Sequence, residues 1–298
     1  MECDEKPQRA TLRGAWPMAI LGGMTTQHAA LFALPALLLA CGGEREVALR
    51  FEGLVGDERA ACGGTYEGVG TTDTELTLAD LRLYVHDVRL VTADGEEHPV
   101  ALEQDGVWQL EDIALLDFET GGECPMGTAE TNTTVRGTVP SGLDVAGVRF
   151  VLGVPRARNH DDVTTAPPPL NLQTMYWNWN GGYKFFRVDA SSTGLPDGFF
   201  VHLGSTGCEG DGRGTVSGCA QDNRVDVELS GYDPDTDTIG VDVGALFAES
   251  DLDTDQGGAP GCMAGFDDMD CRPIFHGFGL PFDGTPPAEE QRLFRVLD

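Results

Sequence analysis

Apolar and polar residues alternate along several stretches of the chain, which is the pattern of strands with one buried face. Turn-forming sequences separate these stretches, such as Asp-Gly at 94–95 and Pro-Ser-Gly at 140–142. The pattern predicts an all-β fold: an antiparallel β-sandwich with long disulfide-stapled loops and few short helices. The alternating stretches are residues 46–54, 81–91, 147–154, 199–203, 225–229 and 239–243.

Only short segments favour a helix. Residues 112–118 and 244–247 indicate helical turns, and residues 289–298 indicate a short helix or a final strand. The proline-rich run 164–170 is expected to be an extended crossover on the surface. Within the stretch 81–91, strict alternation puts His86 on the same face as Tyr84 and Val88.

The first forty residues have the features of an export signal. Residues 24–40 contain no charged side chain, and their apolar core is shorter than the roughly 20 residues that a membrane-spanning helix needs. The run ends in Leu-Leu-Ala-Cys at 38–41, so we expect a lipid on Cys41 that anchors the protein to a membrane. An ordinary secretory peptide is the alternative. The expected organisation is a signal segment at 1–40, a lipidated tether at 41–45 and one β domain at 46–298.

The acidic composition excludes one class of partner. The chain has 49 Asp and Glu against 19 Lys and Arg. Nucleic-acid binding requires clustered basic side chains, so it is not expected. Such acidity suits a solvated surface, cation binding or a basic partner.

Six cysteines follow Cys41, and an even number in an exported chain predicts disulfides. Cys208 and Cys219 flank a glycine-rich loop, and Cys262 and Cys271 flank a short acidic loop. Cys62 and Cys124 would then pair by elimination, although the sequence leaves other connectivities open. A thiolate metal site is the rival interpretation, but the chain has no C-x-x-C spacing.

A calcium site is a candidate at Asp251, Asp253 and Asp255, which are spaced as in a calcium loop. The glycine at 257 falls one position late and no glutamate completes the loop. Solvated acidic turns explain the same residues without a ligand.

Common catalytic motifs are absent: the sequence has no G-x-S-x-G, no H-E-x-x-H and no phosphate-binding glycine loop. Unusual residues are instead concentrated at 158–162, 175–185 and 201–208, and four motifs overlap these segments and one later stretch. These are NHDDVTTAPPPLN at 159–171, MYWNWNGGYKFFR at 175–187, FFVHLGSTGC at 199–208, and PGCMAG at 260–265 with Cys271 beyond it. Together they resemble the MbnP family of copper-binding proteins, over residues 46–283.

The resemblance implies a copper protein that is the substrate of an enzyme rather than an enzyme itself. Its partner would be a MauG/MbnH-like dihaem enzyme of the cytochrome c peroxidase family, which oxidises a tryptophan to kynurenine. Opening the indole ring creates a nitrogen that can bind copper beside histidine, and a thioether from Met175 or Met263 would suit Cu(I). The residues implied are His160, His202 and one of Trp177 and Trp179, with His86 as a further candidate.

Each of these residues also has a structural interpretation. A lone histidine usually makes a hydrogen bond or lies at the surface, methionines more often fill cores, and Trp177 and Trp179 would share a strand face as an aromatic pair. Glycines 181 and 182 indicate a bulge. The alternative functions are a calcium-stabilised structural or adhesive surface lipoprotein and an unrecognised periplasmic enzyme. The expected location is the bacterial cell envelope, periplasmic or at the cell surface, with the outer membrane favoured.

Overall fold

The computed structural model describes residues 43–119, 124, 127–211 and 215–297. The predicted signal segment and Cys41 lie outside the described residues, so both remain predictions. No helix within the described ranges has the length and apolar character needed to cross a membrane.

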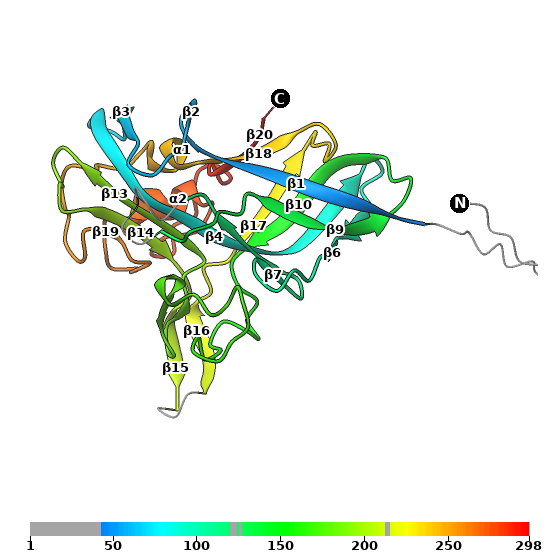
Figure 1. Ribbon diagram of the computed structural model, residues 1–298. Helices are drawn as coiled ribbons and strands as arrows, with labels where there is room; N and C mark the ends of the chain where they lie inside the picture. The colour runs from blue at the N-terminus through cyan, green and yellow to red at the C-terminus, as the bar shows by residue number, and fades with distance from the viewer. Residues whose placement is uncertain (1–42, 120–123, 125–126, 212–214, 298) are drawn as a thin grey trace, which may run out of the picture. The chain divides into compact units, whose positions relative to one another are not determined.

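The first sheet contains six strands in the order β20-β18-β1-β9-β6, with β2 paired to β1 (Figure 1). Strand β1 begins at Glu44, two residues before the predicted start of the β domain. The strands are β1 (Glu44–Val55), β2 (Glu58–Arg59), β6 (Ala101–Leu102), β9 (Thr134–Pro140), β18 (Thr238–Asp242) and β20 (Phe294–Leu297).

The second sheet contains ten strands and is built around β4, which is 19 residues long. Its main order is β17-β10-β4-β13-β14-β19, while β3, β5 and β8 also pair with β4, and β7 pairs with β8. The strands are β3 (Thr65–Val69), β4 (Thr74–Thr92), β5 (Glu97–Pro99), β7 (Gln109–Leu110), β8 (Ile113–Asp117), β10 (Val145–Leu152), β13 (Phe186–Ser192), β14 (Phe199–Leu203), β17 (Val225–Ser230) and β19 (Gly261–Cys262).

Two hairpins and three short helices complete the described part. The hairpins are β11 (Tyr176–Asn178) with β12 (Gly182–Tyr183), and β15 (Thr206–Gly210) with β16 (Val216–Gln221). The helices are η1 (Gln173–Met175), α1 (Val243–Phe247) and α2 (Cys271–Gly277). The β15–β16 hairpin projects beyond the two sheets, next to the loops that precede β13 (Figure 1).

The two sheets bury a common core, as a β-sandwich requires. Leu49 of β1 and Ile239 of β18 are fully buried in the same cluster as Leu83 of β4 and Val188 of β13. The predicted all-β sandwich is confirmed, and most strand pairs are antiparallel. Two pairs are parallel, β1 with β18 and β14 with β19, and the alternation pattern did not indicate them.

A second, smaller core lies on the other face of the ten-stranded sheet. It includes Tyr84, Ile113, Leu115, Met175 and Tyr183, which are all 0% or 1% exposed. This core explains why the prediction of a helical turn at 112–118 was wrong. In β8, Ala114 and Leu116 face the sandwich core while Ile113 and Leu115 face the second core, so both faces of the strand are apolar and no alternation is visible.

The prediction that His86 shares one strand face with Tyr84 and Val88 holds for Tyr84 only. His86 pairs with Ile113 and shares the face of Tyr84, but Val88 is buried in the sandwich core on the opposite face. Asp87 between them has a φ of 50°, and the register between β4 and β10 shifts at this point. The extra residue of a β-bulge reverses the facing of the residues that follow it.

Other expectations at the level of elements are confirmed. The helical turn at 244–247 lies within α1, and the C-terminal segment forms strand β20. The three disulfides join Cys62 to Cys124, Cys208 to Cys219 and Cys262 to Cys271, as the loops suggested.

Candidate metal centre

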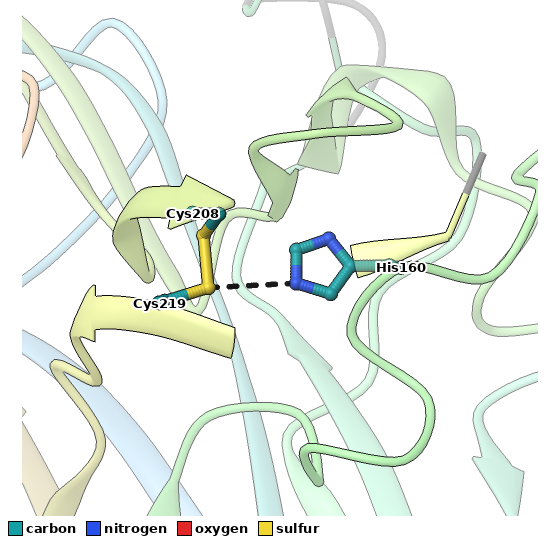
Figure 2. Close-up of side chains that lie close together, drawn as sticks. All are labelled: His160, Cys208 and Cys219. Atoms are coloured by element: carbon teal, nitrogen blue, oxygen red, sulfur yellow. Dashed lines mark hydrogen bonds between the residues drawn. A yellow bond between two sulfur atoms is a disulfide. The ribbon is translucent and has the colours of Figure 1, made fainter. Parts of the chain in front are cut away.

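His160 lies beside the disulfide of the β15–β16 hairpin (Figure 2). Its Nδ1 is 3.1 Å from the carbonyl oxygen of Trp179, and its Nε2 is 3.2 Å from Asn159 Nδ2 and 3.6 Å from Cys219 Sγ. Because a carbonyl only accepts and the Asn159 amide nitrogen only donates, Nδ1 carries the proton and Nε2 presents its lone pair. Partial burial lowers the pKa of His160, which favours this neutral form.

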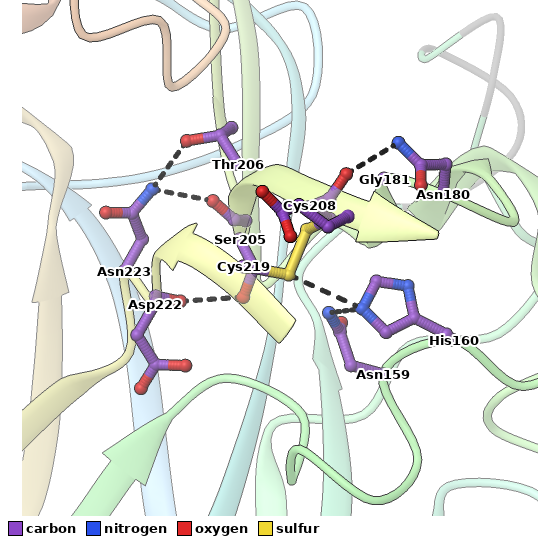
Figure 3. Close-up of a disulfide and its surroundings, with 12 residues drawn as sticks. Asn159, His160, Asn180, Gly181, Ser205, Thr206, Cys208, Cys219, Asp222 and Asn223 are labelled. Atoms are coloured by element: carbon purple, nitrogen blue, oxygen red, sulfur yellow. Dashed lines mark hydrogen bonds between the residues drawn. A yellow bond between two sulfur atoms is a disulfide. The ribbon is translucent and has the colours of Figure 1, made fainter. Parts of the chain in front are cut away.

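The same hairpin brings together three of the segments singled out in the sequence (Figure 3). Asn180 Nδ2 donates to the carbonyl oxygen of Cys208 at 3.2 Å, which ties the turn after β11 to β15. Gly182 lies so close to Asn159 that a Cβ there would meet its carbonyl oxygen at 2.4 Å. The register of β11 and β12 shifts between Tyr176 and Asn178, so the irregularity falls at Trp177 on β11 and not at the predicted glycines 181 and 182.

Trp177 faces a surface pocket of about 300 Å³ that Met263 also lines. The indole packs closely against backbone: a Cβ on Gly204 would lie 2.6 Å from the ring atom Cζ3. Only a glycine fits at that position while the indole stays in place. The small residue of the HLGS segment therefore creates the space in which Trp177 lies.

The strand pair β14–β19 brings the segment of Met263 next to the strand of His202. Val201 pairs with Cys262, and both side chains belong to the sandwich core. His202 follows Val201 within β14 and therefore faces the other side of the sheet, while Met263 directly follows the last residue of β19. The parallel register thus places Met263 level with His202, from segments some sixty residues apart, and Met263 lines the pocket that Trp177 faces.

Asp189 fixes the orientation of His202. The Nε2 atom of His202 is 2.7 Å from Asp189 Oδ1. Burial opposes ionisation of Asp189, but hydrogen bonds from His202 and Arg187 outweigh it and hold the pKa of this carboxyl well below its usual range. Burial lowers the pKa of His202. A neutral His202 that donates from Nε2 to a carboxylate has its free lone pair on Nδ1.

Asp189 belongs to a buried cluster of charges on this face of the sheet. Arg187 contacts both Asp189 and Asp80, with Nε 3.0 Å from Asp80 Oδ2. Arg82, which is fully buried, pairs with Asp80 and lies 3.0 Å from Glu119 Oε1. Together with His202, these side chains form what we call the buried charge cluster. Its members are Asp80, Arg82, Glu119, Arg187, Asp189 and His202.

The buried charge cluster also holds the segment that carries Trp177. Arg82 NH1 donates to the Thr174 hydroxyl at 3.0 Å, and Arg187 NH1 donates to the Thr174 carbonyl at 3.0 Å. Lys184 Nζ donates to the same carbonyl at 2.9 Å, and burial lowers the pKa of Lys184 to about 8. Thr174 lies in η1, directly before β11. One network therefore positions both His202 and the strand of Trp177.

The remaining predicted site residues lie elsewhere. Trp179 is 40% exposed and packs against Gly210. It follows the end of β11, where Asn178 Oδ1 accepts from the backbone of Asn180 and Gly181, so the prediction that both tryptophans share a strand face was wrong. His86 Nδ1 is 2.9 Å from the carbonyl oxygen of Gly153, and burial lowers its pKa. Met175 is fully buried in the second core.

Within the described ranges, two groups of three metal-capable side chains have ligand atoms within 4.8 Å of one another. They are His160 with Cys208 and Cys219, and Glu119 with Cys62 and Cys124. Both include a disulfide, and neither joins two of the predicted histidines. The ligand role of His160, His202 and His86 therefore remains a prediction, and no single centre contains all three.

Asp251, Asp253 and Asp255 do not form such a group in the described part of the chain. The Asp253 carboxylate accepts hydrogen bonds from Thr74 Oγ1 and Gly194 N, each at 2.7 Å. It therefore ties the loop to β4 and to the turn before β14. Calcium binding at these residues remains a prediction without support from the geometry.

Replacing Asp253 by asparagine is expected to remove an acid-sensitive part of the stability. Partial burial raises the pKa of Asp253. Hydrogen bonds from Thr72, Thr74, Gly194 and Ser192 outweigh this effect and lower the pKa to about 2. A depressed pKa contributes stability that is present above the unfolded value and is lost as the pH falls through the folded value. Urea unfolding between pH 5 and pH 2 should therefore show a smaller loss for D253N than for the natural chain.

The exposed Asp57 provides the control, because D57N should leave that pH profile unchanged. Equal acid sensitivity of D253N and the natural chain would contradict the structural role. A calcium-dependent rise in Tm that D253N abolishes would instead support the calcium prediction.

The sequence did not point to the buried charge cluster. Charged residues at 80, 82, 187 and 189 alternate with apolar ones, which is typical of a solvated strand face. Their burial depends on η1 and the loop at Glu119, which cover the sheet. The sequence does contain Asp-x-Arg at 80–82 and Arg-x-Asp at 187–189. Such patterns suggest ion pairs between neighbouring strands, but they do not indicate that the charges are buried.

Comparisons with known proteins point to one family. The family model described as MbnP matches residues 44–264. The solved structure of "MbnP from Methylosinus trichosporium" is 34% identical, superposes with a TM-score of 0.74, and is matched over 85% of this chain and 98% of that chain. A search of curated proteins gives no match. The family match over most of the chain, and the similarity of sequence and fold to a solved member, show that this chain belongs to the MbnP family.

Proposed function

We propose that this chain binds Cu(I) between His202, Met263 and Trp177, after Trp177 has been oxidised to kynurenine. The MbnP family is associated with copper. The observation that carries the proposal is the convergence of Trp177 and Met263 on one pocket, next to the strand position of His202.

The donor atoms suit copper in its reduced state. Thioether sulfur is a soft ligand that favours Cu(I), and neutral imidazole is a common copper ligand. Asp189 leaves the lone pair of His202 Nδ1 free for this purpose. The intact indole of Trp177 offers only an N–H donor, so the third ligand requires a chemical change.

That change is an oxidation of Trp177 by a dihaem enzyme of the peroxidase class. Cleavage of the indole C2–C3 bond with two equivalents of hydrogen peroxide adds two oxygen atoms and releases two waters. Hydrolysis of the resulting formamide then releases formate and leaves an aniline nitrogen next to the ketone. The side chain has then lost one carbon and gained one oxygen, and its nitrogen has a lone pair for the metal.

Trp177 is the better substrate of the two tryptophans. It faces the pocket that Met263 lines, and the residues lining that pocket do not include Trp179. Trp179 makes its backbone contact with His160 instead. An enzyme acting from solvent reaches Trp177 through the open pocket, and the product nitrogen forms beside the methionine sulfur.

The proposal includes the location. A lipid on Cys41 would hold the copper site and its oxidising partner in one compartment of the cell envelope, with the outer membrane favoured. The three disulfides are compatible with an oxidising compartment.

Mass spectrometry of the peptide that contains both tryptophans tests the proposal. Protein produced with its dihaem partner should carry the modification on Trp177, while protein produced alone should not. Fragment ions separate the two positions, because Asn178 lies between them. Copper should be retained by the modified protein, and W177F should bind none under conditions where W179F behaves as the natural chain. Modification at Trp179, or copper retention by W177F in its oxidised, disulfide-bonded form, would overturn the assignment.

A further inference from the structure

We propose that reduction of the Cys208–Cys219 disulfide opens a second Cu(I) site, formed by the two thiolates and His160 Nε2. The three ligand atoms already lie within 4.8 Å of one another. This site is independent of the copper centre proposed above, because it requires neither Trp177 nor its oxidation.

The Nε2 atom of His160 faces the disulfide and also accepts a hydrogen bond from Asn159 Nδ2 at 3.2 Å (Figures 2 and 3). Hydrogen bonding of Nδ1 to the Trp179 carbonyl fixes the tautomer, so Nε2 is unprotonated and lies 3.6 Å from Cys219 Sγ. A structural disulfide needs no such neighbour. A metal held by two thiolates can take a third donor, and the neutral imidazole nitrogen of His160 is in place to supply it.

Contacts other than the disulfide also hold the hairpin (Figure 3). Cys208 and Cys219 are directly opposite each other in the β15–β16 ladder. At the base of the hairpin, Ser205 Oγ donates to the Asp222 carbonyl at 2.7 Å and Asn223 Nδ2 donates to the Gly204 carbonyl at 2.8 Å. These bonds keep the two strands paired after reduction, so rotation of the side chains is sufficient to surround one ion.

Reductants reach this disulfide more readily than the other two. Cys208 and Cys219 are partly exposed, and Cys219 and His160 line an open pocket of about 260 Å³. The cysteines of the other disulfides are at most 8% exposed. Exchange requires an attacking thiolate to approach the sulfur, so access decides which disulfide is reduced first.

The chemistry balances with an external dithiol as the reductant. The dithiol transfers two electrons and two protons, the bond between Cys208 Sγ and Cys219 Sγ breaks, and the reductant becomes a disulfide. Binding of Cu(I) then displaces the two thiol protons. Two thiolates and an imidazole form a soft, low-coordinate donor set, which favours Cu(I) over hard cations.

Copper titration of the full chain, produced without its partner, tests the proposal. Mild reduction should yield one Cu(I) per chain, with a thiolate-to-copper absorption band in the near ultraviolet, and the disulfide form should bind none. Alkylation and peptide mapping should find only Cys208 and Cys219 reduced. Treatment of the reduced chain with iodoacetamide before copper is added should abolish binding, which keeps the test valid if a cysteine variant fails to fold.

Three variants assign the ligands. C208S/C219S should bind no copper. H160A should lose its Cu(I) to a chelator that does not remove Cu(I) from the natural reduced chain. H98A is the matched control, because His98 lies in strand β5 with its Nε2 3.9 Å from Glu96 Oε2, and it should behave as the natural chain. W177F should keep this copper, so the result does not depend on the function proposed above.

Absence of copper from the reduced chain would overturn the proposal. Binding that persists in C208S/C219S would place the thiolates elsewhere and would also overturn it. Unchanged resistance of H160A to the chelator would remove His160 from the site and refute the ligand set.

Discussion

Replacement of Arg82 by methionine should lower the free energy of unfolding by about 3–5 kcal/mol, the range measured when one partner of a buried ion pair is removed. Arg82 is fully buried, pairs with Asp80 and lies 3.0 Å from Glu119 Oε1. Without it, two acidic side chains remain in the interior with one fewer cation between them. Burial and the nearby Asp80 raise the pKa of Glu119 to about 8 even when Arg82 is present. Urea unfolding monitored by tryptophan fluorescence measures the effect.

The control is Arg89→Met, because Arg89 pairs with Asp87 and Glu97 while its side chain is 35% exposed. Exposed pairs contribute about 0–1 kcal/mol, so R89M should remain close to the natural chain. If R82M is too unstable to purify, R82K keeps the charge and should be intermediate. Equal losses in the free energy of unfolding for R82M and R89M would mean that the buried charge cluster stabilises the protein no more than an exposed ion pair does.

Replacement of Asp189 by asparagine should weaken copper binding about 10–100-fold, the usual effect of losing a residue that orients a metal-ligating histidine. The carboxylate accepts from His202 Nε2 at 2.7 Å and so leaves the lone pair on Nδ1. The amide of asparagine can donate to Nε2 instead, which would favour the opposite tautomer. Competition with a Cu(I) chelator, on protein whose Trp177 has been oxidised, measures the affinity.

A second measurement separates positioning from stability. Nitrogen-15 NMR of the copper-free protein should find the proton of His202 on Nε2 in the natural chain and on Nδ1 in D189N. The matched variant is D80N, which alters the same buried charge cluster without touching His202. It should be destabilised but should keep both the tautomer and the copper affinity. An unchanged tautomer in D189N would contradict the positioning role, whatever the copper result.

The strands of the sandwich were the most predictable part of the molecule. Residues 199–203 coincide with β14, and the other alternating stretches lie within or next to β1, β4, β10, β17 and β18. Alternation is reliable there because each strand has one face in the core and one face covered by polar groups or solvent. It failed at β8, which is buried on both faces, and beyond Asp87, where a bulge changes the period.

The sequence indicated which segments contribute to the candidate site, but it did not indicate which of their side chains lie together. The sequence alone indicated six of the sandwich strands, suggested the disulfide pairs and indicated the family, because local periodicity and short motifs are properties of neighbouring residues. The tertiary structure decided which of those residues meet. The β14–β19 register brings Met263 level with His202, and the charges of Asp80, Arg82, Arg187 and Asp189 are buried by η1 and the loop at Glu119. Such long-range pairing and covering depend on the whole chain, so no local pattern contains them.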